Sequence, residues 1–291
     1  MANLSFPEMP PPFMTVRCHE LSAQPSLSGL CVGYEQDEWR GKQFVDHMFR
    51  WLPEFALTLS ECRSLTTGNA VELLEKAARI VYETKKFENR GEFGELFLHA
   101  AVRQVFSSVP AISKIYYKTT LNETVKGFDA VHVVGPADNL ELELDAVKFQ
   151  KDISDAIQKV AKEIEEHLVA DYLRNEFILI GNKLDQSWEH TPVLKRLLAQ
   201  ETSLDQVFAR ACIPVLLTYD SDCIGGFSRC CEKYEAAFEK ELSGIKERFA
   251  KKMKKMSIPQ DVRIHLFLLP LKSKPDLVTL LDAKLRAWQN I

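Results

Sequence analysis

Residues 140–149 read Leu-Glu-Leu-Glu-Leu-Asp-Ala-Val-Lys-Phe, and apolar and charged side chains alternate over the first six positions. Strict alternation over this length predicts a β-strand with one buried face. Two other apolar, β-branched stretches precede it, at residues 115–120 and 128–134, with turn-like sequences between the three. Together they predict an antiparallel meander of three strands.

The segments around this meander predict helices and further strands. Helical spacing of apolar residues is found before it, over 37–59, 69–85 and 91–107. After it, a long charged helix is expected over 152–173, and short apolar strands at 177–181, 213–219 and 263–269 alternate with helices at 190–200, 227–255 and 275–289. Such alternation favours parallel pairing with both sheet faces covered. The expected fold class is therefore α/β, a mixed β-sheet flanked by helices.

The domain organisation follows from the same pattern. We expect a flexible, Pro-rich segment over residues 1–12 and a mainly helical region over 13–90. The sheet-bearing core and a C-terminal α/β extension are expected over 91–291.

Composition limits the class of protein without naming its function. The chain has 291 residues, 46% of them hydrophobic and 27% charged, which is typical of a soluble globular protein. Its net charge of −4 does not indicate nucleic-acid binding, although a local basic patch is compatible with it. Seven irregularly spaced cysteines favour reduced thiols over disulfides or zinc. No signal sequence or membrane-length apolar run is recognised, so we expect a cytoplasmic protein with no membrane partner.

One group of polar residues could carry chemistry. Glu92 and Glu95 lie three residues apart on a predicted helix, Asp129 on the second predicted strand, and Lys148 near the end of the third. Carboxylate oxygens are ligands for Mg²⁺, and a bound metal can generate a hydroxide and neutralise a phosphate. Solvated surface charges are the ordinary alternative, because such sets occur by chance on many α/β proteins.

Other features have ordinary interpretations. The basic run over 246–255 is expected to be the solvated end of a helix. His99 and His132 are expected to be structural, and the three glutamates Glu163, Glu165 and Glu166 are expected to form an exposed helix face. A small-molecule α/β enzyme is disfavoured because no glycine-rich strand-to-helix loop is found.

Several longer motifs together resemble one protein family. They are RGEFGELFLH (90–99), KIYYKTTLNETVKGFDAVHVV (114–134), LELDAVKF (142–149), IPVLLTYDS (213–221) and FLLPLKSKPDLVTLLDAKL (267–285). In order and spacing these motifs resemble the HamA family, also described as a domain of unknown function, DUF1837. The similarity extends over most of the chain from about residue 37.

The resemblance implies a function and a set of site residues. It implies a PD-(D/E)xK nuclease-like core over 91–291 and a DNA nuclease that uses Mg²⁺ or Mn²⁺. It also implies a helicase-like partner subunit, HamB, in the bacterial Hachiman anti-phage defence system. Glu95 matches the helix acid and Asp129 the strand acid, both as metal ligands. Lys148 matches the lysine of the Glu-x-Lys element, and Glu92 is a weaker candidate.

The chain departs from the family pattern at position 146, where Ala146 stands in place of the expected glutamate. Residues 146 and 148 of a strand point to one face while Asp145 points to the other. Asp145 therefore cannot replace the missing acid unless a β-bulge re-aims it. Either an introduced Glu→Ala change has inactivated the site, or a natural homologue has a weakened or relocated site. The first is favoured because the other site positions are intact.

Two functions from different classes remain. The first is a metal-dependent DNA nuclease effector of anti-phage defence, restrained by a helicase-like partner and inactivated at Ala146. The alternative is a non-catalytic interaction subunit that binds DNA or the helicase. The codon for residue 146 in the encoding gene would discriminate between them, since the alternative requires a natural alanine.

Overall fold

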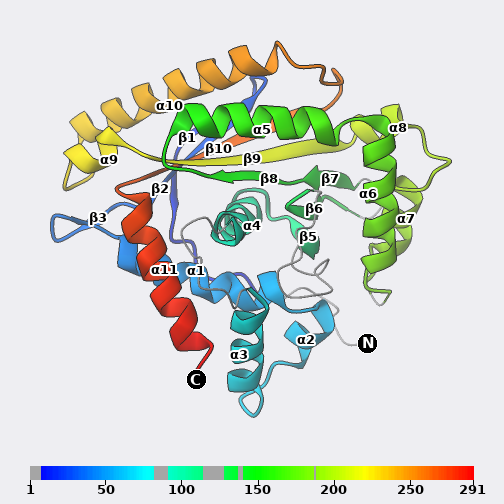
Figure 1. Ribbon diagram of the computed structural model, residues 1–291, viewed down its shortest axis with the longest axis horizontal. Helices are drawn as coiled ribbons and strands as arrows, with labels where there is room; N and C mark the ends of the chain where they lie inside the picture. The colour runs from blue at the N-terminus through cyan, green and yellow to red at the C-terminus, as the bar shows by residue number, and fades with distance from the viewer. Residues whose placement is uncertain (1–7, 82–90, 114–127, 137–139, 187) are drawn as a thin grey trace.

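A mixed sheet forms the centre of the molecule (Figure 1). The computed structural model describes residues 8–81, 91–113, 128–136, 140–186 and 188–291. Within these residues the sheet has eight strands in the order β1-β2-β10-β9-β7-β6-β5, and β8 also pairs with β9. The strands are β1 (Thr15–Glu20), β2 (Ser26–Cys31), β5 (Val109–Ser113), β6 (Ala130–Val134), β7 (Glu141–Leu144), β8 (Ala146–Phe149), β9 (Ala211–Asp220) and β10 (Arg263–Leu271).

Strand direction divides this sheet into a parallel centre and antiparallel edges. β10 pairs in parallel with β2 and β9, and β9 pairs in parallel with both β7 and β8. β1 is antiparallel to β2, and β5, β6 and β7 form an antiparallel meander. The predicted mixed α/β fold is therefore confirmed, but the first strand of the observed meander, β5 (Val109–Ser113), was not predicted. The strand expected at 115–120 lies outside the described residues.

Helices cover both faces of the sheet (Figure 1). α5 (Ile153–His167) and α10 (Glu232–Met253) lie on one face, and α1 (Gly41–Ala56), α4 (Glu92–Phe106) and α11 (Lys274–Trp288) lie on the other. The other elements are α2 (Leu59–Ser64), α3 (Ala70–Val81), α6 (Ala170–Lys183), α7 (Thr191–Leu197), α8 (Leu204–Phe208), α9 (Asp222–Gly226) and the small hairpin β3 (Tyr34–Glu35) and β4 (Glu38–Trp39). None of the helices in the described ranges has the length and apolarity to cross a bilayer.

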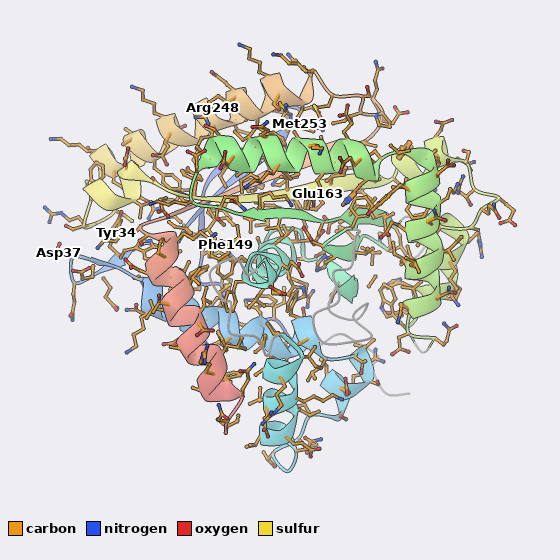
Figure 2. The ribbon with its side chains drawn as sticks, in the orientation of Figure 1. Tyr34, Asp37, Phe149, Glu163, Arg248 and Met253 are labelled. Atoms are coloured by element: carbon orange, nitrogen blue, oxygen red, sulfur yellow. The ribbon has the colours of Figure 1, made fainter. Side chains whose placement is uncertain are left out.

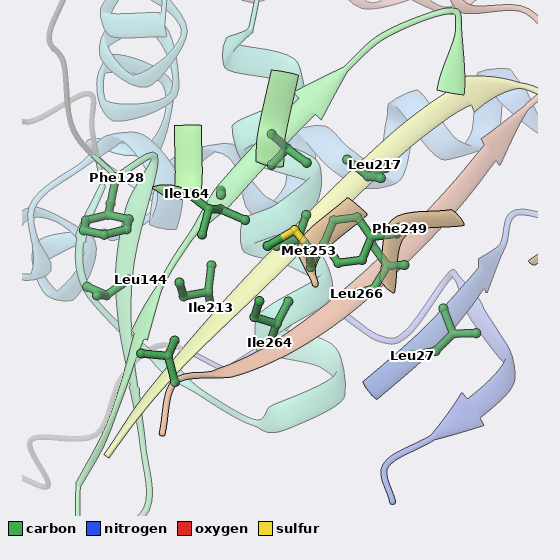
Figure 3. Close-up of a cluster of buried hydrophobic side chains, with 14 of the residues drawn as sticks. Leu27, Phe128, Leu144, Ile164, Ile213, Leu217, Phe249, Met253, Ile264 and Leu266 are labelled. Carbon is green, nitrogen blue, oxygen red and sulfur yellow. The ribbon is translucent and has the colours of Figure 1, made fainter. Parts of the chain in front are cut away.

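Two hydrophobic cores follow from this layering. Side chains alternate between the faces of a strand, so Ala146 and Leu217 join the core beneath α5 and α10. Val147 and Leu216, their neighbours in sequence, join the core around α4 and α1. Figure 3 shows part of the first core, where Ile164 of α5 and Phe249 of α10 pack against the sheet.

The N-terminal region differs from the expectation of a mainly helical segment over 13–90. Besides α1, α2 and α3 it supplies β1 and β2 to the main sheet, so it is not separate from the core. All six residues of β2 are buried, and its small residues show no alternation that a sequence pattern could detect. Gly29 allows close packing there, since an added Cβ would lie 2.2 Å from Leu242 Cδ1. In the predicted flexible segment, residues 8–12 form neither helix nor strand, and residues 1–7 are not described.

The strand expected at 177–181 is wrong, because these residues lie within α6. Phe177 and Ile180 are buried, whereas Ile178 and Leu179 are 58% and 44% exposed. This three-residue spacing is helical, but a run of four apolar residues does not distinguish helix from strand. The long helix expected over 152–173 is likewise two helices, because α5 ends at His167 and α6 begins at Ala170.

Candidate functional site

The strand predicted over 140–149 is broken at Asp145, and the break creates a fork in the sheet. The Asp129 N–H donates to the Asp145 carbonyl at 2.9 Å, and the Asp145 N–H donates to the Ala130 carbonyl at 3.0 Å. These bonds end the pairing of β6 with β7, while β8 continues along β9 alone. Asp129 Oδ2 then accepts a hydrogen bond from the buried Val147 N–H at 2.8 Å. The carboxylate thus replaces a ladder bond that β6 no longer supplies.

Lys148 reaches the same residue from the α5 side of β8. Its Nζ donates to the Val147 carbonyl at 2.8 Å and forms an ion pair with Glu163 of α5. An N–H and a C=O of one residue are at most about 3.6 Å apart, so the Asp129 carboxylate and the Lys148 ammonium lie within roughly 9 Å. The structure therefore brings these two sequence-predicted residues together at the backbone of Val147.

Glu95 approaches from the opposite face of the sheet. It lies in the first turn of α4, where the positive end of the helix suits acidic side chains, and Glu92 precedes it by one turn. Both are partly exposed. An added Cβ on Gly94, the residue before Glu95, would lie 3.1 Å from Val147 Cγ2, so this turn rests directly on β8.

Ala146 lies on the α5 face, as strand alternation requires. It is 1% exposed and belongs to the core beneath α5, on the same face as Lys148 and its partner Glu163. Asp145 points the other way, toward His132 on β6. In Figure 2, Glu163 lies between α5 and β8, whereas Phe149 lies on the α4 side of the strand. Asp145 therefore does not fill the place of an acid at position 146.

A buried chain of polar side chains lies behind the fork. Arg103 Nε donates to Glu54 Oε1 at 2.6 Å, and His99 Nε2 lies 3.1 Å from the same oxygen. His99 Nδ1 lies 3.1 Å from His132 Nε2, and His132 Nδ1 lies 2.9 Å from Asp145 Oδ2. These contacts connect α1, α4 and β6 to the strand break.

The protonation of this chain follows from its neighbours. Burial alone would raise the pKa of Glu54, but His99 and Arg103 outweigh it and hold that pKa at about 2. Burial lowers the pKa of His99 to about 4. Burial raises the pKa of Asp145, an effect that His132 opposes and Asp129 increases. The Glu54 carboxylate is therefore ionised beside a neutral His99 ring. The charges of Arg103 and Glu54 cancel at the end of this chain that lies on α1 and α4, and their pairing reduces the cost of burying both.

The donor chemistry of the fork fits a hard divalent cation. Within the residues that the structure describes, no three His, Cys, Asp or Glu side chains are placed to hold a metal ion. Mg²⁺, however, commonly keeps several waters and takes one or two carboxylates together with substrate phosphates. Asp129 and Glu95 are oxygen donors of that kind, and position 146 adds none.

Sequence analysis missed one residue of this site, Glu163, and named two others, Asp129 and Lys148, whose contacts meet at Val147. Glu163 was expected on an exposed face, but its side chain is 24% exposed and pairs with Lys148. Its place beside the buried stripe of Val160 and Ile164 is the signal that could have indicated this. His99 and His132 are structural, as expected, although their joint link to Asp145 was not foreseen.

The fold and the fork define a mixed α/β protein with acids and a lysine gathered where two paired strands separate. The family model of HamA matches residues 11–285, so the chain belongs to the HamA family. The chain is also similar to Anti-bacteriophage protein A of Escherichia coli (strain K12), with 24% identity over 272 residues. That match covers 87% of this chain and 46% of the relative, so the chain spans about half the relative's length.

Proposed function

We propose that this protein is a metal-dependent DNA nuclease acting as an effector of bacterial anti-phage defence. The observation that carries the proposal is the meeting of Asp129 and Lys148 on one residue, Val147, at the strand fork. The acidic start of α4 rests on the same residue. Membership of the HamA family and similarity to a protein named for anti-bacteriophage action support the biological setting.

Each residue has a distinct part in this proposal. Asp129 and Glu95 would hold Mg²⁺ or Mn²⁺, which when bound supplies a nucleophilic hydroxide at neutral pH and neutralises phosphate charge. Lys148 carries a cation on a partly exposed side chain, where it can contact a phosphate oxygen or orient the attacking water. Ala146 offers no ligand, so cleavage by this chain is expected to be slow.

The second candidate function is a non-catalytic subunit that binds DNA or a helicase. The observation in its favour is the complete burial of Ala146 among apolar residues, which leaves no acid on the α5 face of β8. In that case Lys148 and Glu163 form only a structural ion pair.

Plasmid cleavage with Mg²⁺ tests the nuclease proposal. Ala146→Glu should raise the cleavage rate about 100- to 1000-fold, because a carboxylate is restored where the phosphate needs a cation. Adding Lys148→Ala to that variant should abolish cleavage again, and chelation should do the same. If Ala146→Glu remains folded but inert with partner and DNA present, the interaction-subunit function takes its place.

A helicase-like partner, HamB, is part of the same proposal and rests on the family resemblance. A nuclease in a cell that contains its own genome requires restraint, and a stable partner subunit provides it. Co-expression of the two chains followed by size-exclusion chromatography should yield one complex. Separate elution at micromolar concentration would count against this partner.

A further inference from the structure

We propose that Glu163 of α5 binds the cation in place of the carboxylate that position 146 lacks, but from the helix side, where it does not give the fast cleavage expected of an acid on the strand. This inference rests on the proposed function, because it adds a metal-binding residue to the same site. It concerns a different element of the fold, since Glu163 lies on a helix that covers the sheet, whereas the family pattern places this acid on the strand.

The first argument is the direction of Glu163. The neighbouring acids of α5 have other partners: Glu165 accepts a hydrogen bond from the Ser257 N–H, and Glu166 pairs with Lys162. Glu163 instead reaches the Lys148 ammonium across the gap between helix and strand (Figure 2). It is therefore the acid of this trio that is directed to the site.

The second argument is the position of the Lys148 ammonium. Nζ folds back to the Val147 carbonyl, so it lies beside the strand rather than beyond its end. A glutamate at position 146 would project from the same face two residues earlier and would bring its carboxylate beside this lysine. The Glu163 carboxylate contacts the same ammonium from α5.

The third argument is freedom to move. The side chains of Lys148 and Glu163 are 17% and 24% exposed, so both can shift toward a cation without opening the core. Asp129 contacts the other backbone group of Val147, because its Oδ2 accepts a hydrogen bond from the Val147 N–H. In this proposal Asp129 and Glu163, acids from two segments of the fold, bind the cation, with Lys148 beside it.

A simple ion pair that fixes Lys148 is the ordinary alternative, and cation binding separates the two. A partly exposed pair of this kind contributes little to stability. If Glu163 only positions Lys148, its removal changes cleavage but leaves the affinity for a divalent cation unchanged. If Glu163 is a ligand, its removal weakens cation binding in the absence of DNA.

Isothermal titration of the full chain with Mn²⁺ alone provides the test. Glu163→Gln should raise the Kd by about ten-fold or more, because one of few carboxylate ligands is lost. Glu166→Gln removes the same charge from the same helix and should leave the Kd within about two-fold, since surface charge acts weakly at that distance. Circular dichroism should show that both variants are folded.

A second variant tests directly whether Glu163 of α5 replaces an acid at position 146 of the strand. In an Ala146→Glu background the strand supplies the acid, so adding Glu163→Gln should change the Kd by less than about three-fold. Unchanged Mn²⁺ binding by Glu163→Gln in the parent chain overturns the inference, as does a parent chain that binds no Mn²⁺. Asp129→Asn tells the failures apart, because unaltered binding in that variant overturns the proposed site itself.

Discussion

At the scale of single residues, Asp129 combines a structural and a chemical part. Its Oδ2 satisfies the Val147 N–H where the β6 ladder ends, and the same carboxylate is the candidate ligand of the fork. A buried N–H without a partner is costly, so the geometry of the site is tied to the stability of the strand. The two roles of Asp129 can be separated, because binding a cation needs a negative charge whereas accepting a hydrogen bond from the Val147 N–H needs only an oxygen.

Two substitutions of Asp129 should therefore differ in stability. Asp129→Asn keeps an oxygen for the Val147 N–H and should cost less than about 1 kcal/mol, whereas Asp129→Ala leaves the N–H unpaired and should cost about 1–3 kcal/mol. Urea unfolding at neutral pH measures both. Equal losses for the two variants would show that this hydrogen bond does not hold the fork together. Both variants should lose Mn²⁺ binding.

At the scale of elements, the packing of α4 on β8 brings an acidic helix turn to a strand. The helix has no side chain at Gly94, where an added Cβ would lie 2.9 Å from Phe149 Cβ. A contact that close is shorter than van der Waals packing permits, so helix and strand would have to separate. The absence of a methyl group thus sets the distance between Glu95 and the fork.

Gly94→Ala should destabilise the protein by about 1–3 kcal/mol, because overpacking forces backbone shifts. Gly244→Ala is the control, since Gly244 lies in the interior of α10 and has no atom within 4 Å of an added Cβ. That control should gain about 0.5–1 kcal/mol from helix propensity. Thermal unfolding of the two variants measures the difference, and a stabilised Gly94→Ala would contradict the close contact.

Sequence patterns predicted those strands and helices that have one polar and one apolar face. Alternation located the third strand of the meander, and helical spacing located α1, α4 and α11. These patterns failed for β2, which is buried on both faces. They also failed for residues 177–181, where a run of four apolar residues fits a helix as well as a strand. For the site, Asp129 and Lys148 could be named from motifs. Glu163 could not, because its partner is determined by the packing of α5 on β8.

At the scale of the whole molecule, buried histidines make the fold sensitive to acid. Burial lowers the pKa of His47, His99 and His265 to about 4 each, from an ordinary value of 6.5. Between these two values the unfolded chain binds protons that the folded chain does not. Stability from these residues is therefore complete above about pH 6.5 and is lost as the pH falls toward 4.

The Tm should fall steeply between pH 6.5 and pH 4, with a loss on the order of several kcal/mol in the free energy of unfolding. His265→Asn should lower the Tm at pH 7, because it disturbs contacts with Ser26 and Ser28, but should flatten its pH dependence. Differential scanning calorimetry across this range measures both effects. A Tm that is constant from pH 6.5 to 4.5 would contradict burial of neutral histidines.

The place of β10 in the sheet has a consequence for biosynthesis. β10 fills the gap between β2 and β9, and Ser26 of β2 contacts His265 of β10 across 239 residues of chain. During translation at roughly 5–20 residues per second, β1 and β2 therefore wait on the order of ten seconds or more for the strand on which they dock. A nascent chain lacks the centre of its sheet until β10 has left the ribosome. With this topology the sheet can be completed only after residues 263–271 have been synthesised.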